Sequence, residues 1–382
     1  MNRVSCTLAA AAALVSAVTP ALAMQSDAPQ APPTKVSITT VAKGLENPWG
    51  LQVLPDGRLL VTERPGRLRI VNQDGKLSAP IAGVPAVHAK GQGGLLDVRL
   101  ATDFATSGTL FLSFSEPRGG GTAGTAVVRA TLRLDPASGG GRLENVTRIF
   151  QQNPAGSAGQ HYGSRIVIDK TGALFVTTGD RGNMSDKAQD PAVTIGKVIR
   201  INPDGSIPAD NPKVDGWAPE VWSMGHRNIQ GAVLDPASGK LWTVEHGARG
   251  GDELNQPLPG RNHGWPVISY GRHYSGFKIG EGTQKSGMEQ PVYFWDPSIA
   301  TSGLEIYTGD LFAGWKGNLL VGGLAGSHIA RLVVKDGQVV AQEKLAEGRG
   351  DRFRDLRQAP DGAIYALTDD SNGEILRIAP AR

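Results

Sequence analysis

A histidine and an aspartate stand at the two ends of a strand pair that the sequence predicts. His161 comes shortly before the apolar run at 166–168, and Asp180 closes the next run at TTGD. A neutral imidazole is the usual proton acceptor at neutral pH, and a nearby carboxylate could orient it. His161 is therefore a candidate general base. A loop histidine hydrogen-bonded to the main chain, beside an aspartate that caps a turn, fits the same pattern.

Two groups of cationic and amide side chains offer a second kind of chemistry. Arg227, Asn228 and Gln230 introduce another apolar run, and Arg352 and Arg354 stand two residues apart in DRFRDLR. Guanidinium groups suit carboxylates and developing oxyanions. Because side chains alternate along a strand, Arg352 and Arg354 would face the same side and could clamp an anion. Surface ion pairs are the plain alternative for both groups.

The Gly-rich segment GARGGDEL, residues 247–254, offers hard oxygen ligands. Its main-chain carbonyls, together with Asp252 and Glu253, suit Ca²⁺. His246 and His263 lack the spacing of a zinc site. The sequence also lacks the GxSxG, P-loop and strand-GxGxxG-helix motifs. The segment therefore predicts a calcium site.

A short repeat indicates the elements that must position these residues. Gly, any residue, Leu or Ile, and two or three mostly apolar residues recur as hairpins with glycine at a positive-φ position. The copies begin at Gly57, Gly108, Gly172, Gly239, Gly317 and Gly362. Six copies spaced about 50–70 residues apart predict an all-β fold, a six-bladed β-propeller of four-stranded antiparallel blades. A pair of β-sandwiches or a β-helix is the alternative.

The two chain ends complete the expected organisation. Residues 1–23 have a positive start, an apolar run and an A-x-A site, which predicts a cleavable signal peptide rather than a membrane anchor. Residues 24–35 are expected to be a disordered leader, and residues 36–382 a single propeller domain. The pattern EILRI at 374–378 comes just before the C-terminus, so strands from both ends are expected to close one blade. The only cysteine, Cys6, lies in the signal peptide, so no disulfide is expected.

Composition excludes one class of partner. The mature chain would carry 38 basic and 36 acidic residues once Arg3 is removed with the signal peptide. A near-neutral balance without a basic run gives no argument for nucleic-acid binding. The 51 glycines and 25 prolines favour many short strands with tight turns, and 40% hydrophobic residues suffice for a core.

Longer motifs resemble one family. The segments are NPWGLQVLPDGRLLVTERPGRLRIV, GQGGLLDV, HYGSRIVID, GHRNIQG, GGDELN, RNHGWP, YSGFK and DRFRDLRQAPDG. In this order they resemble the soluble quinoprotein sugar dehydrogenases, the glucose/sorbosone dehydrogenase family. The similarity covers nearly all of residues 40–380 and implies a six-bladed propeller that binds pyrroloquinoline quinone (PQQ) with Ca²⁺ at the mouth of its channel.

The resemblance also implies roles for individual residues. His161 matches the general base, with Arg227 stabilising the charge that develops. The residues expected to hold the quinone are Gln92, Arg227, Asn228, Gln230, Tyr274, Arg352 and Arg354. Carbonyls of Gly247 and Ala248 match the loop that binds the calcium of the cofactor. Glu253 and the carbonyl of His263 match a second, structural calcium site.

The activity implied is a periplasmic quinoprotein that oxidises aldoses at C1 to lactones. A soluble electron acceptor would take the electrons, and the protein would be a monomer or homodimer without a membrane anchor. Two other functions remain open. One is a propeller without cofactor that binds a sugar or a protein partner. The other is a calcium-dependent lactonase, in which the paired arginines of DRFRDLR would have no role.

One position departs from the family pattern. Where the family has Leu-Lys, this chain has Leu324-Ala325, so a lysine expected to contact the cofactor is missing. Loss of a cation beside a trianionic ligand weakens binding most in a dry site. Arg331 and Arg349 are the substitutes that the sequence suggests. His263 in place of Tyr, and Ala248 in place of Pro, leave carbonyl ligands intact.

Overall fold

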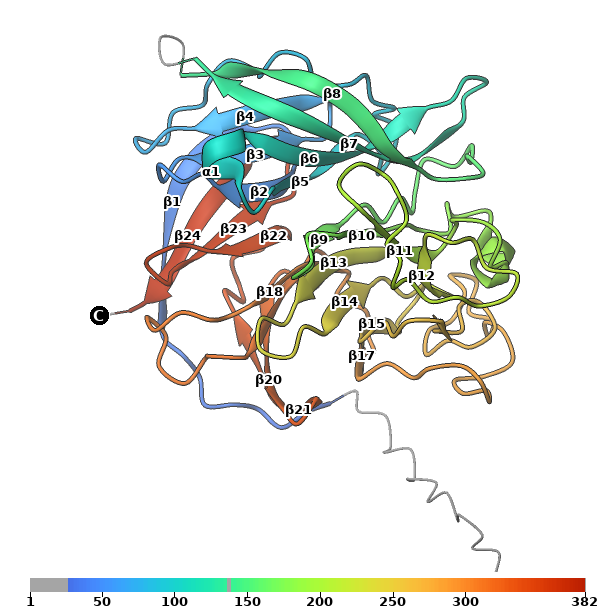
Figure 1. Ribbon diagram of the computed structural model, residues 1–382. Helices are drawn as coiled ribbons and strands as arrows, with labels where there is room; N and C mark the ends of the chain where they lie inside the picture. The colour runs from blue at the N-terminus through green and yellow to red at the C-terminus, as the bar shows by residue number, and fades with distance from the viewer. Residues whose placement is uncertain (1–26, 136–138, 382) are drawn as a thin grey trace, which may run out of the picture.

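The computed structural model describes residues 27–135 and 139–381, so the predicted signal peptide 1–23 lies outside the described residues. Six β-sheets are arranged as a ring, as Figure 1 shows, and the predicted six-bladed β-propeller is confirmed. Within the described ranges, the only helical segments are α1 (Phe104–Ser107) and η1 (Ser185–Gln189). None of the helices in these ranges is long and apolar enough to cross a membrane.

The first three blades follow one another along the chain. The first contains β2 (Pro48–Val53), β3 (Leu59–Glu63) and β4 (Arg67–Val71). The second contains β5 (Leu95–Leu100), β6 (Thr109–Pro117), β7 (Ala123–Leu134) and β8 (Gly141–Gln151). The third contains β9 (Ile166–Ile168), β10 (Leu174–Thr177), β11 (Lys197–Ile201) and β12 (Val221–Met224).

The other three blades complete the ring. The fourth contains β13 (Ile229–Leu234), β14 (Leu241–Glu245), β15 (Asp252–Asn255) and β17 (Tyr293–Trp295). The fifth contains β18 (Thr301–Ile306), β19 (Leu319–Gly323), β20 (Ile329–Lys335) and β21 (Gln338–Leu345). The sixth contains β22 (Phe353–Gln358), β23 (Ile364–Thr368), β24 (Gly373–Pro380) and β1 (Val36–Leu45).

Two blades differ in detail from the four-stranded pattern. In the first blade, the place of a fourth strand is taken by an isolated bridge between Val71 and Leu77. In the third blade, the short β16 (Arg261–Asn262) adds to β12 in parallel. All other neighbouring strands within the sheets pair antiparallel.

The six repeated glycines mark the same turn in every blade. Each lies between the first and second strand of its blade, as Gly57 does between β2 and β3 and Gly362 does between β22 and β23. All six have positive φ, from 68° at Gly108 to 91° at Gly172. That conformation is strained for residues with a Cβ, so the local turn explains why the repeat needs glycine.

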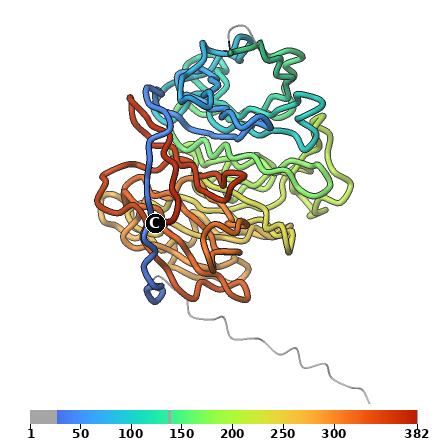
Figure 2. Tube along the Cα trace, turned by 90° about the vertical axis from the view of Figure 1, so that its left-hand side faces the viewer, coloured from blue at the N-terminus to red at the C-terminus, as the bar shows by residue number. Residues whose placement is uncertain are grey.

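The two chain ends meet in the sixth blade. The N-terminal strand β1 pairs with the C-terminal β24, from Val36 opposite Pro380 to Leu45 opposite Gly373. Figure 2 shows these blue and red segments side by side. Residues 27–35, part of the leader that the sequence predicts to be disordered, lie against β21, where the Ala31 amide donates to the Gln342 carbonyl at 2.7 Å. A free main-chain edge on β21 gives this segment its hydrogen-bond partners.

Apolar side chains fill the spaces between neighbouring blades. Between the first two blades, for example, Leu60 and Leu68 pack with Leu95, Leu112 and Phe114, all at most 3% exposed. Burial of both faces of each sheet explains why many strands are apolar in succession rather than strictly alternating. Face-to-face packing of this kind fixes each blade against the next.

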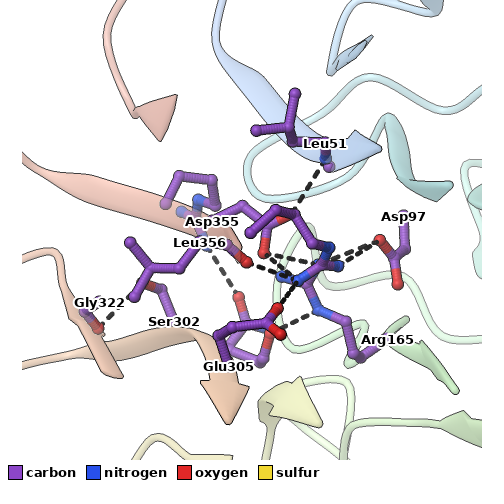
Figure 3. Close-up of polar contacts among 12 residues, drawn as sticks. Leu51, Asp97, Arg165, Ser302, Glu305, Gly322, Asp355 and Leu356 are labelled. Carbon is purple, nitrogen blue, oxygen red and sulfur yellow. Dashed lines mark hydrogen bonds and ion pairs between the residues drawn. The ribbon is translucent and has the colours of Figure 1, made fainter. Parts of the chain in front are cut away.

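The innermost strands are joined by ionic and hydrogen-bonded contacts in the centre of the ring (Figure 3). Arg165, just before β9, lies 3.0 Å from Asp97 of β5 and 3.1 Å from Asp355 of β22. Asp355 accepts from the Leu51 amide of β2 at 3.0 Å, and Arg165 donates to the Gln230 carbonyl of β13 at 3.1 Å. Glu305 of β18 lies 3.7 Å from Arg357, so the network includes all six blades.

Candidate active site

The propeller topology brings two sets of strand ends to one face. Because each first strand starts at this face and each second strand returns to it, residues before first strands meet residues after second strands. His161 and Arg227 belong to the first set. Asp180 and His246, which follow β10 and β14, belong to the second set. Polar side chains from separate blades therefore surround one mouth of the channel.

His161 and Asp180 form a buried pair at this face. The His161 Nδ1 and Asp180 Oδ1 atoms are 2.6 Å apart, and the two residues are 7% and 1% exposed. His161 has a φ of 54°, which is uncommon outside glycine. Its amide donates to Gln92 Oε1 at 2.8 Å, and the Trp265 indole donates to Asp180 Oδ2 at 2.8 Å. Asp180 thus orients the imidazole, Trp265 fixes Asp180, and Gln92 fixes the main chain of His161.

Electrostatics keep this imidazole neutral and the carboxylate ionised. Burial lowers the pKa of His161, the Asp180 hydrogen bond opposes that shift, and the Arg227 charge adds to it. Burial raises the pKa of Asp180, but the hydrogen bonds from His161 and from the Gly182 amide, together with the Arg227 charge, bring it below its usual value. An ionised Asp180 accepts the Nδ1 proton, which leaves the lone pair on His161 Nε2. That nitrogen can accept a proton.

A pocket of about 290 Å³, called here the base pocket, opens beside this pair. Its walls include His161, Arg227, His246, Ala248, Trp265 and Tyr274. The Arg227 guanidinium donates to the His246 carbonyl at 3.3 Å and lies 5.3 Å from the centre of the Trp265 ring. Tyr274 is 76% exposed, so it stands at the rim. Proton acceptor, cation and aromatic wall share one cavity.

A second pocket of about 240 Å³, called here the arginine pocket, shares Gln92 and His246 with the base pocket. Its walls include Trp49, Arg64, Gln230, Arg352, Arg354 and Asp369. Arg354 and Arg352 lie 3.0 and 3.4 Å from Asp369 Oδ2. Burial raises the pKa of Asp369, but Arg354 and the other guanidiniums bring it below its usual value. Three arginines face one carboxylate, so positive charge is in excess.

Several buried polar atoms between the two pockets lack partners among the residues that the structure describes. Asn228 Oδ1 accepts from the Gly163 amide at 3.1 Å and from Gln230 Nε2 at 3.2 Å, whereas Asn228 Nδ2 has no partner. His246 Nε2 and Arg354 Nε are also buried without partners. Burial lowers the pKa of His246 to about 3, helped by the charges of Arg227 and Arg354. Unpaired buried polar atoms are costly, and a ligand with several polar atoms would satisfy them.

The residues predicted for the cofactor calcium lie in the loop after β14. Ala248 lines the base pocket, and Gly247 precedes it. The Asp252 carboxylate instead fixes this loop, because it accepts from the Gly247 amide at 2.9 Å and from Ser298 Oγ at 2.6 Å. Main-chain oxygens of Gly247 and Ala248 are the donor type that Ca²⁺ prefers.

Glu253 and His263, predicted for a structural calcium, line neither pocket. Asn255 Nδ2 donates to both Glu253 and Glu245 at 3.1 Å, and burial together with Glu245 raises the pKa of Glu253 to about 8. His263 stacks on His226 with ring centres 4.7 Å apart. No three His, Cys, Asp or Glu side chains within the described ranges form a group that could hold a metal ion. The predicted site depends on a main-chain oxygen as well.

Arg64, His246 and Asp369 line the pockets but are absent from the residues that the sequence suggests. Each stands seven residues after the repeat glycine of its blade, namely Gly57, Gly239 and Gly362. The second strand of a blade occupies the interval, so the seventh residue emerges at the channel mouth. The repeat that predicts the fold thus also marks these positions, if the offset from each glycine is counted.

The fold and the site define a β-propeller with a proton-accepting pocket and a cationic pocket at one channel mouth. Residues 45–377 match the family model Glucose / Sorbosone dehydrogenase. The aldose sugar dehydrogenase YliI of Escherichia coli is 43% identical over 360 residues, which cover 93% of this chain and 96% of that protein. The chain therefore belongs to the glucose/sorbosone dehydrogenase family, and the resemblance noted in its motifs is confirmed.

Solved structures agree with this assignment. A crystal structure of a glucose dehydrogenase is 47% identical, with a TM-score of 0.86, and the match covers 91% of this chain and 100% of that chain. The PQQ-bound form of the aldose sugar dehydrogenase of Streptomyces coelicolor is 29% identical, with a TM-score of 0.74, and covers 91% of this chain and 100% of its own.

Proposed function

We propose that this protein is a quinoprotein dehydrogenase that oxidises aldose sugars at C1 to lactones. Pyrroloquinoline quinone would be held across the arginine and base pockets with Ca²⁺ at the Gly247 and Ala248 carbonyls. The observation that carries the proposal is the neutral His161 imidazole, paired with an ionised Asp180, beside a pocket with excess positive charge. When bound, the quinone supplies an acceptor for the hydride that leaves C1 of the sugar.

The residues present fit a ligand with several carboxylates. Arg352 and Arg354 have planar donor groups that match carboxylates, and one Asp369 balances only part of their charge. Asn228 Nδ2 and Arg354 Nε offer buried donors without acceptors among the described residues. A compact polyanion with ring oxygens would balance the excess positive charge and accept hydrogen bonds from the unpaired donors. The predicted binding residues Gln92 and Gln230 border the same pocket.

The chain would contribute a base, an orienting carboxylate and a cation. His161 Nε2 takes the proton of the anomeric hydroxyl, and Asp180 stabilises the imidazolium that forms. Arg227, 7% exposed in the same pocket, stabilises negative charge that develops on an oxygen there. Trp265 and the rim residue Tyr274 offer aromatic surface against which a sugar could lie.

The remaining parts of the proposal follow from the sequence. Glu253 and the His263 carbonyl would bind a structural calcium, since a cation would compensate the closely placed carboxylates of Glu245 and Glu253. The signal peptide at 1–23 would direct the protein to the periplasm, where a soluble acceptor takes the electrons. The paired arginines have no role in a lactonase, so the dehydrogenase is favoured over that alternative.

A titration tests the proposal. Purified, metal-stripped protein is titrated with pyrroloquinoline quinone with and without Ca²⁺, binding is followed by absorbance, and dye reduction is measured with a panel of aldoses. We expect saturable, calcium-dependent binding and sugar-dependent dye reduction. Absence of binding would refute the proposal and favour a propeller that works without cofactor. Binding without turnover by any aldose would refute the substrate class.

A further inference from the structure

Arg64 is a third arginine at the cationic pocket, contributed by the first blade. It directly follows β3, and its main chain is fixed between two blades: its amide donates to Asn47 and its carbonyl accepts from Leu95, both at 3.1 Å. The guanidinium donates to the Gly91 carbonyl at 2.5 Å. Its Nε is buried and has no hydrogen-bond partner in the described part of the chain. The side chain therefore lines the pocket with spare donors.

The charge of Arg64 is not neutralised by a partner of its own. Among the described residues, the one carboxylate that lines the arginine pocket belongs to Asp369, whose Oδ2 is already contacted by Arg352 and Arg354. Burial lowers the pKa of Arg64, Asp369 opposes that shift, and the charges of Arg354 and Arg352 add to it. Arg64 lies near two other guanidinium groups and has no carboxylate of its own among the described residues. An anionic ligand would therefore stabilise its charge.

The cation missing at position 325 has no replacement from the two arginines that the sequence suggests. Arg331 is bound to Glu343 at 2.6 Å and to Asn318 at 2.7 Å, and neither it nor Arg349 lines the arginine pocket. Arg349 is bound to Asp351 at 2.7 Å. Leu324, next to Ala325, does line that pocket, and its carbonyl accepts from Arg352 at 3.2 Å. The positive charge that is absent at position 325 would therefore have lain beside the arginine pocket, which Arg64 also lines.

We propose that Arg64 binds a carboxylate of the quinone directly and supplies the positive charge that a lysine at position 325 would otherwise contribute. This inference rests on the proposed function, because the ligand is the one proposed for the arginine pocket. Arg64 reaches the pocket from the first blade, whereas position 325 belongs to the fifth. Arg64 would therefore approach the ligand from a different side of the pocket than a lysine at position 325 would.

Binding titrations of four proteins test the inference: the wild type, Arg64→Gln, Ala325→Lys and the double variant. Each is titrated with pyrroloquinoline quinone and Ca²⁺, and the dissociation constant is measured by absorbance without added sugar. We expect Arg64→Gln to weaken binding about 10- to 100-fold, as for a lost charge-assisted hydrogen bond. Ala325→Lys should tighten binding at least about tenfold in the Arg64→Gln background, but much less in the wild type, because the two cations compensate one another.

Arg58→Gln is the matched control. Arg58 immediately precedes β3, whereas Arg64 immediately follows it, and it pairs with Asp56 at 2.7 Å. Its removal changes the net charge equally but should leave binding within about twofold of the wild type, because Arg58 lies outside both pockets and salt screens distant charges. If Arg64→Gln does not fold, Arg64→Lys replaces it, and loss of the planar fork should still weaken binding several-fold.

The outcomes separate this inference from the proposed function. Wild-type binding with unchanged affinity in Arg64→Gln would overturn the role of Arg64 and leave the quinone site standing. Equal tightening by Ala325→Lys in both backgrounds would overturn the compensation. Failure of the wild type to bind the quinone would overturn the proposed function itself.

Discussion

At the scale of single residues, the proposed chemistry depends on which nitrogen of His161 is free. The ionised Asp180 accepts from Nδ1, and Trp265 holds the other carboxylate oxygen. Burial and the Arg227 charge favour the neutral imidazole. In the proposed mechanism, His161 would therefore accept a proton near pH 7 without first having to lose one. Its competence is lost only when acid protonates Nε2.

Variants of His161 and Asp180 test this chemistry through turnover and its dependence on pH. His161→Ala should lower kcat about 10²- to 10⁴-fold, since the base is removed. In the wild type the acid limb of kcat/KM should lie below pH 6.5, because the pKa of His161 is lowered. Asp180→Asn removes the interaction that opposes this shift, so the limb should move to still lower pH while turnover falls at least about tenfold.

The control for these variants is Asp186→Asn, an equal change at an exposed residue in η1. It should leave both the acid limb and turnover close to those of the wild type. An acid limb that stays in place in Asp180→Asn would contradict the pairing with His161. Stopped-flow or steady-state dye reduction between pH 4.5 and about 9 measures all three profiles.

At the scale of elements, Lys197 joins strand β11 to the helical turn η1. Its ammonium donates to the carbonyls of Lys187 and Ala188 at 3.0 Å and to Ile195 at 2.5 Å, and it is fully buried. Three carbonyls satisfy the three N–H groups of an ammonium. Because η1 carries Ser185 to the wall of the base pocket, Lys197 is a positioning residue for that wall.

Replacement of Lys197 tests this link. Lys197→Met should lower the free energy of unfolding by about 2–4 kcal/mol, because carbonyls lose their donors. The KM for sugar should rise more than kcat falls, since the pocket wall loosens while His161 keeps its partners. Urea denaturation and steady-state kinetics measure the two effects. Lys187→Met, at a residue paired with Asp190 at 3.4 Å and 42% exposed, should change stability by no more than about 1 kcal/mol. Equal effects of the two variants would contradict the assignment.

Elements also show what the sequence could predict. Each of the six hairpins has a turn that requires glycine at positive φ. Gly57 and its counterparts therefore predict the blades from local sequence alone, without knowledge of distant contacts. The pairing of Arg352 with Arg354 follows from alternation within one strand. The arrival of Arg64 beside Arg354 depends on closure of the ring between the first and sixth blades, which no local pattern contains. The motifs and the repeat could therefore indicate which residues reach the channel mouth, but not which of them ring closure places side by side.

At the scale of the whole molecule, the ionic network in Figure 3 connects the blades beneath the site. Arg165 contacts Asp97 and Asp355, and its guanidinium lies 4.3 Å from the centre of the Trp49 ring. Trp49 in turn lines the arginine pocket. Blades that contribute single residues to the site are thus held in register by buried charges. Such charges stabilise only while each retains a partner.

Asp97→Asn tests the role of this network. The change keeps the size of the side chain but removes a buried negative charge, so Asp355 becomes the one carboxylate within the described residues that pairs with Arg165. We expect the free energy of unfolding to fall by about 3 kcal/mol, measured by urea denaturation. Asp210→Asn is the control, because Asp210 pairs with Arg200 at 2.8 Å but is 70% exposed, and it should leave the unfolding midpoint nearly unchanged. Since the network includes all six blades, unfolding of Asp97→Asn should remain a single transition with a lower midpoint. Loss of one blade in a separate, earlier transition would instead show that the network does not couple the ring.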